Sequence, residues 1–364
     1  MRILNLLFSF TVGGTERLVT DVCNSLVKQD NDVHLFIVND LVDDAMINRL
    51  DSNVHIVQYA RPVGGGKIKV LLDLARYIKK WKIDVIHCNA LNTPELLLVV
   101  KLVNPTVKII YTIHGMNQYC QLGKIKIIYR NLICDRFIAI SESVKADIIK
   151  AGANADKTIV VYNAIDFDRI ETKNVARRTF DKKNVVIGNI ARFQPAVKGQ
   201  DILYEAMGIL IKKYPTIKCY FAGASDQEHM QEYVIIRKKA KKEYPNNIFF
   251  VGNINDVALF LSKVDLFVLP SRSEGFGLSL VEAMSMGVPC IASKLAGPEE
   301  VMEYGKRGRL FKSGNIEELA AVIDFVIQNY AQEKKIAEEN SQYVKNKYNI
   351  ERMTEQLLEI YQEA

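Results

Sequence analysis

Residues that commonly build metal sites and disulfides are scarce in this sequence. Its 364 residues include six cysteines without a CxxC pair, five histidines and one tryptophan. Most of the cysteines stand within apolar runs, where a thiol behaves as a small hydrophobic group. Because the clustered ligands that zinc requires are also missing from the sequence, we expect reduced thiols, a cytoplasmic location and no structural zinc.

Long apolar runs are absent as well. No stretch approaches the roughly 18 uninterrupted apolar residues of a membrane helix. The apolar segment 1–10, MRILNLLFSF, is too short to cross a bilayer and shows no small-residue cleavage site, so we interpret it as a buried first strand. Ordinary NTPases and hydrolases are disfavoured, because the sequence shows neither a GxxxxGK[ST] loop nor a Ser–His–acid set.

The composition that remains is typical of a folded globular protein, with 49% hydrophobic and 25% charged residues. The length predicts two domains, since domains cluster at about 100–150 residues. Short β-branched runs alternate with helical segments, which indicates parallel sheets buried on both faces and an α/β fold with two doubly wound, Rossmann-like domains. The expected strands are 2–8, 32–38, 53–57, 85–88, 108–112, 136–139 and 158–162, followed by 184–188, 217–222, 247–251, 266–269 and 290–292.

Breaks in this alternation give the domain boundaries. We expect residues 1–167 to form the first domain, the charged segment 168–183 to be a linker and residues 184–343 to form the second domain. Residues 316–364 have helical periodicity and no strand signal. Folds of this class bind ligands beyond the carboxyl ends of their strands, so the loops that follow the strands are the expected place for a site.

The segment 264–293, VDLFVLPSRSEGFGLSLVEAMSMGVPCIAS, is predicted to be strand, loop, helix, turn and strand. Glu274 stands in the loop and Glu282 in the second turn of the helix. Gly275 and Gly277 allow the backbone to approach a ligand, and the free N–H groups that open the helix favour a phosphate. Glu282 could be a surface residue of an amphipathic helix, but its neighbours are apolar. We expect it to face a ligand cleft and to accept hydrogen bonds.

This segment resembles the signature of glycosyltransferase family 4, a retaining family with the GT-B fold, whose pattern is P-S-x-x-E-G-F-G-L-x-x-x-E-A-M-A-x-G-x-P-V. The resemblance implies that Glu282 accepts both ribose hydroxyls of a nucleotide-sugar donor and that Glu274 contacts the transferred sugar. It also implies that backbone N–H groups bind the sugar and phosphates, namely those of Gly275, Phe276, Gly277 and Leu278. In that fold two Rossmann-like domains face each other across a cleft, and a C-terminal helix, here 344–364, returns to the first domain.

Two cations precede this segment. The stretch 188–200, GNIARFQPAVKGQ, resembles the family's G-R-x-x-x-x-K-G motif with a longer loop. Arg192 and Lys198 would neutralise a diphosphate leaving group without a metal ion, since arginine binds oxyanions with two N–H groups and lysine supplies a point charge. Ordinary surface charge is the alternative for both residues.

The first half offers two further candidates. Gly13 and Gly14 follow the first strand and open a helix, where glycine allows close approach to a phosphate or sugar, although this signal is weak alone. His114 ends the strand 108–112 in the sequence YTIHG. A lone histidine is usually structural, but the resemblance places it against the transferred sugar as a contact residue rather than as a general base. It also places Gly13 and Gly14 beneath the donor phosphates and the acceptor.

The net charge of +6 includes basic clusters at Lys67/Lys69, at Lys79/Lys80/Lys82 and at Lys124/Lys126/Arg130. Such clusters suit an anionic membrane surface or a solvated helix face, and without an aromatic-basic motif they do not indicate nucleic-acid binding.

Together the residues and the resemblance predict a metal-independent glycosyltransferase that uses a donor such as a UDP- or GDP-sugar. We expect a lipid-linked saccharide acceptor in cell-surface polysaccharide synthesis, and peripheral contact of the first domain with the inner face of the cell membrane. A nucleotide-sugar epimerase of the same fold and a non-catalytic nucleotide-sugar-binding protein are the alternatives. The motifs do not select the sugar or the base, because the ribose and diphosphate contacts are common to different nucleotides.

Overall fold

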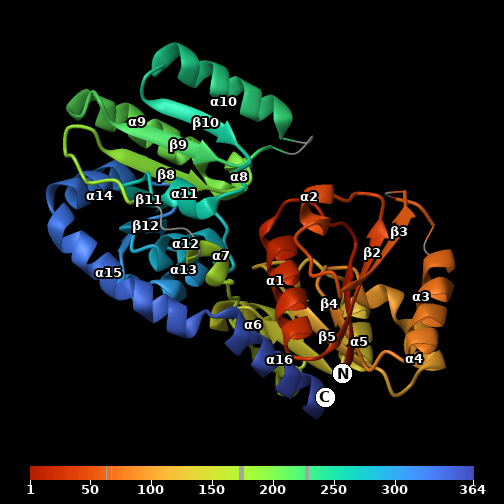
Figure 1. Cartoon of the computed structure of the whole chain (residues 1–364). Helices are drawn as coiled ribbons and strands as arrows, with labels where there is room; N and C mark the ends of the chain where they lie inside the picture. The colour runs from red at the N-terminus through yellow and green to blue at the C-terminus, as the bar shows by residue number, and fades with distance from the viewer. Residues whose placement is uncertain (63, 67, 172–175, 226–228) are drawn as a thin grey trace. The chain divides into compact units, whose positions relative to one another are not determined.

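The computed structural model describes residues 1–62, 64–66, 68–171, 176–225 and 229–364 (Figure 1). These residues form two compact units, one of Met1–Ile165 with Ile350–Ala364 and the other of Asp166–Asn349. Each unit is a parallel sheet flanked by helices, so the predicted fold class of two doubly wound α/β domains is confirmed. Within the described ranges, no helix combines the length and apolar character needed to cross a membrane.

The sheet of the first unit has seven parallel strands in the order β3-β2-β1-β4-β5-β6-β7. The strand order reverses between β1 and β4, and loops at such a switch point diverge to leave room for a ligand. The strands are β1 (Arg2–Leu7), β2 (Asp32–Asn39), β3 (His55–Arg61), β4 (Val85–Cys88), β5 (Lys108–Ile113), β6 (Arg136–Ala139) and β7 (Thr158–Val160). The helices are α1 (Gly14–Lys28), α2 (Asp44–Ile47), α3 (Ile68–Trp81), η1 (Pro94–Leu96), α4 (Leu98–Val103), α5 (Lys124–Ile133), α6 (Glu142–Lys150), η2 (Ala155–Lys157) and α16 (Ile350–Glu363).

The last helix, α16, belongs to the first unit although it lies at the far end of the chain. Its apolar residues recur at helical spacing, and Met353, Leu357 and Tyr361 are buried. A hydrogen bond of 2.8 Å joins the hydroxyls of Thr354 and Ser25 on α1. Since α1 follows the central strand β1, the C-terminal helix completes the cover of this sheet.

The sheet of the second unit has six parallel strands in the order β10-β9-β8-β11-β12-β13, with its switch point between β8 and β11. The strands are β8 (Val186–Ile190), β9 (Lys218–Ala222), β10 (Ile248–Gly252), β11 (Leu266–Leu269), β12 (Cys290–Ser293) and β13 (Arg309–Phe311). The helices are α7 (Asp168–Glu171), α8 (Pro195–Lys198), α9 (Gln200–Lys213), α10 (Met230–Glu243), α11 (Val257–Leu261), α12 (Leu278–Ser285), α13 (Ala296–Val301), η3 (Glu303–Gly305), α14 (Ile316–Gln328) and α15 (Tyr330–Lys347).

The segment 168–183, expected to be a linker, includes residues 172–175, which lie outside the described residues. Its beginning forms the short helix α7, and its end is attached to the second unit. Arg178 donates to Asp265 at 3.2 Å, and the Phe180 and Tyr330 rings stack at 3.6 Å. Both contacts link the charged segment to elements of that unit.

Candidate functional site

Two loops of the second unit leave the sheet side by side at its switch point. One loop follows β8 and contains Arg192 and Lys198, and the other follows β11 and contains Glu274. The two strands are hydrogen-bonded neighbours, with Leu266 in register with Ile187. Because both strands are parallel, their carboxyl ends reach the same edge of the sheet. The fold therefore brings together residues that are about 80 positions apart in the sequence.

Backbone contacts hold these loops against each other. The carbonyl oxygen of Val197 accepts hydrogen bonds from the N–H groups of Arg272, at 2.8 Å, and Ser273, at 3.2 Å. Gly199 has a φ of 66°, and a Cβ atom there would lie 1.9 Å from the carbonyl oxygen of Pro270. Only glycine fits this crossing without displacing backbone.

A bidentate ion pair adds a second link between the loops. The Arg272 guanidinium donates to both carboxylate oxygens of Asp201, at 2.6 and 2.7 Å. It also donates to the carbonyl oxygen of Pro195 at 2.8 Å. Arg272 and Asp201 were not among the predicted site residues, and their role is to fix the loops that carry the charged groups.

The predicted Lys198 and Glu274 are in direct contact. The Lys198 Nζ atom lies 2.9 Å from Glu274 Oε2, and the side chains are 25% and 14% exposed. The Ser271 hydroxyl donates to the same carboxylate oxygen at 3.3 Å. The two charges neutralise each other and stay partly accessible, so an incoming anion can compete for the ammonium group.

The start of α12 adds a site for an anion beside this pair. Its N-cap residue, Gly277, has a φ of 98° and provides no side-chain cap, so no N-cap side chain accepts from the first N–H groups of the helix. The dipole of the helix also favours negative charge at this end. Gly297 of α13 lies directly behind the loop, since a Cβ atom there would be 2.5 Å from Gly275.

Glu282 lies one turn further along α12 and is buried. It receives a hydrogen bond of 3.3 Å from the guanidinium of Arg169 on α7, a residue that the sequence interpretation did not single out. The sequence gives one indication that Glu282 has such a partner: a carboxylate on an apolar helix needs a cation or several hydrogen-bond donors. Glu282 therefore follows the β11 loop closely along the chain, is buried, and is paired with Arg169.

Arg192 follows β8 at the same sheet edge and is exposed. Its carbonyl oxygen accepts a hydrogen bond of 2.9 Å from the amide of Gln200, the first residue of α9. This contact fixes the backbone of the loop. The loop from Arg192 to Lys198 includes the short helix α8, which accounts for the extra residues relative to the family motif.

The predicted residues of the first unit also gather at the carboxyl edge of their sheet. Gly13 is the extended N-cap residue of α1, and Gly14 begins the helix. His114 directly follows β5, and its Nε2 atom lies 3.3 Å from the Oδ1 atom of Asn89, which follows β4. Asn89 in turn donates to Asn5 on β1 at 3.1 Å. This polar chain crosses the switch point, and the sequence did not reveal it because its members lie far apart.

Burial sets the charge state of His114. It lowers the pKa of the imidazole to about 4, so the ring is neutral near pH 7. Its Nδ1 atom is buried and has no hydrogen-bond partner among the described residues. A buried polar atom of this kind is satisfied by water or a ligand. A neutral ring can donate or accept one hydrogen bond there, as the expected sugar contact requires.

One expected basic cluster needs correction. Lys124 and Lys126 are exposed, but Arg130 is fully buried and pairs with Glu95 at 2.6 Å. Its guanidinium also packs on the rings of Tyr111 and Tyr119. The periodicity of α5 places Arg130 toward the sheet, where an arginine is tolerated because it has both a carboxylate partner and aromatic faces. Lys67 of another cluster lies outside the described residues.

Comparisons with known families match almost the whole chain in two adjoining parts. The family described as Glycosyltransferase Family 4 matches residues 12–169, and the family described as Glycosyl transferases group 1 matches residues 171–347. The two boundaries nearly coincide with the division between the structural units.

Individual relatives have low sequence identity to this chain but align over most of its length. The capsular polysaccharide biosynthesis glycosyltransferase CapM of Staphylococcus aureus is 23% identical and aligns over 96% of this chain and 95% of its own. A UDP-Gal:alpha-D-GlcNAc-diphosphoundecaprenol alpha-1,3-galactosyltransferase of Escherichia coli is 23% identical over 84% of this chain and 82% of its own. The crystal structure of HepE from Anabaena in complex with UDP-glucose has a TM-score of 0.83 at 21% identity and covers 100% of both chains.

Proposed function

Because the chain belongs to the glycosyltransferases of group 1 and family 4, which have the GT-B fold, we propose that it is a retaining enzyme that uses a nucleoside diphosphate sugar. The observation that carries this proposal is the contact between Lys198 and Glu274 at the switch point of the second unit. A cation and a carboxylate stand there beside the uncapped start of α12. These groups suit a donor with an anionic diphosphate and a sugar that gains positive charge during transfer.

The donor diphosphate binds to the positive groups of the switch-point loops. Lys198 exchanges its partner from Glu274 to a phosphate oxygen, Arg192 binds a second oxygen, and the N–H groups of Gly275 to Leu278 complete the contacts. Positive charge from the protein then neutralises the negative charge of the leaving diphosphate, a role that a metal ion could also fill. Glu282 accepts the ribose hydroxyls, with Arg169 holding its carboxylate in place.

Transfer takes place on one face of the sugar. The bond from the anomeric carbon to the diphosphate oxygen breaks, and the acceptor oxygen bonds to the same face. The proton of the acceptor hydroxyl passes to the departing diphosphate, so no protein base is needed. Glu274, released from Lys198, stabilises the cationic sugar, and neutral His114 hydrogen-bonds a sugar hydroxyl.

We propose cell-surface polysaccharide synthesis as the process, because the relatives include enzymes named for capsule synthesis and for a diphosphoundecaprenol-linked acceptor. A lipid-linked acceptor calls for a protein surface that meets a membrane. We propose α5 for this contact, because three of its apolar side chains are 84%, 60% and 76% exposed: Ile125, Ile128 and Leu132. Their spacing puts them on one face of the helix, and the exposed Lys124 and Lys126 flank them.

Flotation with vesicles tests the membrane contact. Ile125→Ser with Ile128→Ser should lower binding to phosphatidylglycerol vesicles by at least about tenfold, because each apolar side chain contributes roughly 1.5–3 kcal/mol when fully buried. Ile235→Ser is the matched control, since Ile235 on α10 is 65% exposed in the other unit. Equal binding by the double variant and the control would show that α5 does not meet the membrane.

The reaction itself is tested by supplying UDP-, GDP- and ADP-sugars with and without a diphosphoundecaprenol-linked saccharide acceptor. A transferase releases nucleoside diphosphate rapidly only when acceptor is present. An epimerase changes the donor without acceptor, and a binding protein gives a thermal shift without turnover. Thermal shifts across the donors also identify the base and the sugar, which the diphosphate contacts alone do not select.

A further inference from the structure

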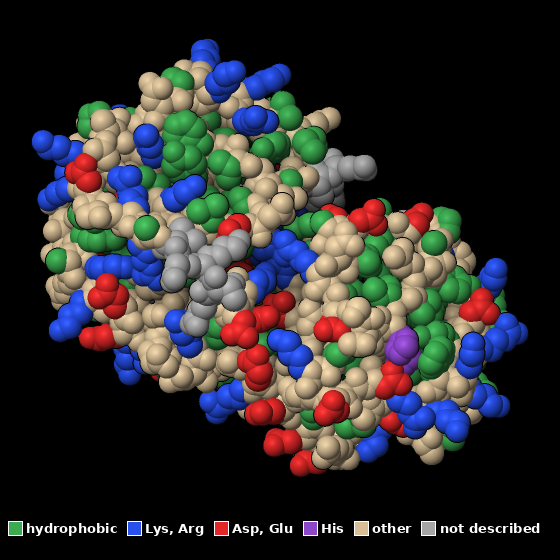
Figure 2. Space-filling view, in the orientation of Figure 1, with side chains coloured by type: hydrophobic (Ala, Val, Ile, Leu, Met, Phe, Trp, Pro, Cys, Tyr) green, Lys and Arg blue, Asp and Glu red, His purple; other side chains and the backbone are tan. Residues whose placement is uncertain are grey.

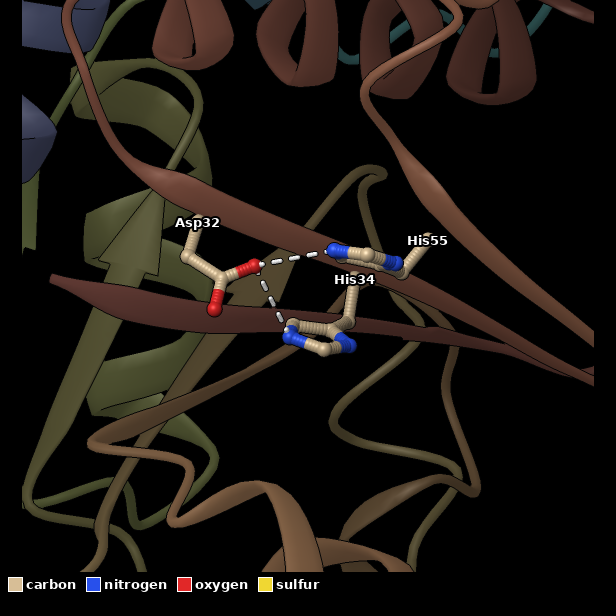
Figure 3. A group of neighbouring side chains, drawn as sticks. All are labelled: Asp32, His34 and His55. Carbon is tan, nitrogen blue, oxygen red and sulfur yellow. Dashed lines mark ion pairs between the residues drawn. The ribbon is translucent and has the colours of Figure 1, made fainter.

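Three side chains of the kinds that bind metal ions lie at the amino ends of β2 and β3. Asp32 is the first residue of β2, His34 is the third, and His55 opens β3. Side chains two residues apart on a strand share a face, and the register pairs His34 with His55. The three side chains therefore share one face of the sheet and converge, as Figure 3 shows.

Their spacing suits a single bound ion. Asp32 Oδ1 lies 3.1 Å from His34 Nε2 and 3.4 Å from His55 Nε2. One ligand atom from each residue lies within 4.8 Å of the others. Zinc bonds of about 2.0–2.1 Å in a tetrahedron place the ligand atoms roughly 3.3 Å apart, which is close to both contacts with Asp32. The His55 ring is 49% exposed and can turn to complete the geometry.

His34 provides independent evidence that the group is built for a ligand. Its side chain is fully buried, and its Nε2 atom has no other partner within the described part of the chain than the Asp32 carboxylate, which lies 3.1 Å away. The other nitrogen, Nδ1, lies 2.8 Å from the Tyr77 hydroxyl. When Nδ1–H donates to Tyr77, the Nε2 lone pair faces the space beside Asp32. Metal-binding histidines are commonly oriented by such a bond at the second nitrogen.

Aromatic side chains enclose the buried His34 ring and limit its movement. Tyr77 and Trp81 of α3 pack against His34, with ring centroids 5.7 and 5.3 Å from its own. The Asp32 carboxylate beside the two imidazoles supplies negative charge, which attracts a divalent cation.

We propose that Asp32, His34 and His55 bind one divalent transition-metal ion of the zinc class. Two imidazoles and one carboxylate suit zinc, whereas magnesium and calcium prefer oxygen ligands. Asp32 is 40% exposed, so a water molecule has access to the fourth position. Figure 2 shows a histidine side chain at the surface of the first unit beside acidic and hydrophobic ones. The site lies at the opposite strand ends from Gly13 and His114, so it ties β2 to β3 and has no part in sugar transfer.

The chain contains a built-in reporter for this test. Trp81 is the single tryptophan of the sequence, and its ring lies 5.3 Å from those of both His34 and His55. The experiment uses the full chain with Cys120→Ser, which removes the exposed thiol as a competing ligand. Calorimetry with zinc chloride should give one ion per chain, and paramagnetic cobalt chloride should quench the tryptophan fluorescence with the same stoichiometry.

Two variants at exposed positions avoid the folding problem that replacement of buried His34 would bring. His55→Ala and Asp32→Asn should each weaken zinc binding at least about tenfold, and Tyr77→Phe should weaken it by a similar factor through the orientation of His34. His229→Ala in the other unit is the control and should bind as the parent does. The proposal is overturned if the parent binds no zinc at micromolar concentrations, or if His55→Ala and Asp32→Asn bind it as tightly as the control.

Discussion

At the scale of single residues, the candidate donor site consists of charges that are neutralised within the protein and can be exchanged for ligand charges. Lys198 and Glu274 neutralise each other at 2.9 Å while both remain partly exposed. The sequence predicted both residues, because the family motif is local. It did not predict Arg169 as the partner of Glu282, since that contact joins positions 113 residues apart. Arg130 shows the same limitation, because a local cluster of basic residues does not reveal which of them faces the core.

A glycine at the crossing of the two loops gives a prediction at this scale. Gly199→Ala should lower the free energy of unfolding by about 2–4 kcal/mol, from an unfavourable positive φ and a contact with Pro270 that forces the backbone apart. It should also lower transfer activity, because Lys198 is the preceding residue. Gly314→Ala is matched in having a φ of 85° but meets no atom within 4 Å, so it should cost only about 1 kcal/mol. Chemical denaturation of both variants checks the difference, and equal losses would contradict the role of the crossing.

At the scale of elements, strands that are buried on both faces were the most predictable. The bounds of β4, β6 and β11 are those that the apolar runs predict, because nearly every residue in them faces the core. The edge strand β3 instead continues to Arg61, beyond the expected end at residue 57. Only Arg61 of β3 is buried, and exposed polar residues such as Gln58 interrupt the apolar run, so the run does not reveal the end of the strand. Helix α16 was predictable as a helix, but its packing partner is set by tertiary contacts.

Those contacts include a buried histidine that makes stability depend on pH. The Nδ1 atom of His87 on β4 lies 2.6 Å from the Tyr361 hydroxyl of α16, and its Nε2 atom lies 2.6 Å from the Thr112 hydroxyl of β5. Burial, followed by the effect of His114, lowers the pKa of His87 to about 3. Above about pH 6.5 the histidine is neutral in both the folded and unfolded states. Below that pH only the unfolded chain takes up the proton, so stability is lost as the pH falls toward 3.

The first unit should therefore lose up to about 1.4 kcal/mol of unfolding free energy per pH unit for each such histidine, between about pH 6.5 and 4. His87→Gln should reduce this slope, and His229→Gln in the second unit should leave it unchanged. Urea denaturation at several pH values measures the slope. A slope that is the same in His87→Gln and in the unmodified chain would contradict the assignment.

At the scale of the whole molecule, the first unit is formed by two separate parts of the sequence. The second unit, Asp166–Asn349, is inserted between the main part of the first unit and its last helix. The sequence indicated two domains from length and from the two series of strands, and it indicated a helical tail from periodicity. The family resemblance predicted that a C-terminal helix, 344–364, returns to the first domain. Periodicity alone does not predict this, because contacts such as the one between Ser25 and Thr354 join distant positions.

Truncation after Asn349 tests this arrangement. Loss of α16 exposes the apolar surface of α1 and removes the partners of Ser25 and His87. Calorimetry should show a marked fall in the transition of the first unit, while the second unit keeps its transition and its stabilisation by donor nucleotide. Chain with a stop after Tyr361 is the control, because it keeps the buried residues of α16. Equal destabilisation of both units by the truncation would contradict the division.

The central claim is that Lys198 acts on the leaving diphosphate during transfer, and it is tested most directly by comparing kcat and donor affinity in Lys198→Ala. Lys212→Ala, which removes an exposed lysine from α9 of the same unit, is the control. We predict that kcat for Lys198→Ala falls by about 10²–10³ while the Kd for donor, measured by calorimetry, rises by less than about tenfold. A kcat close to that of Lys212→Ala would contradict the account.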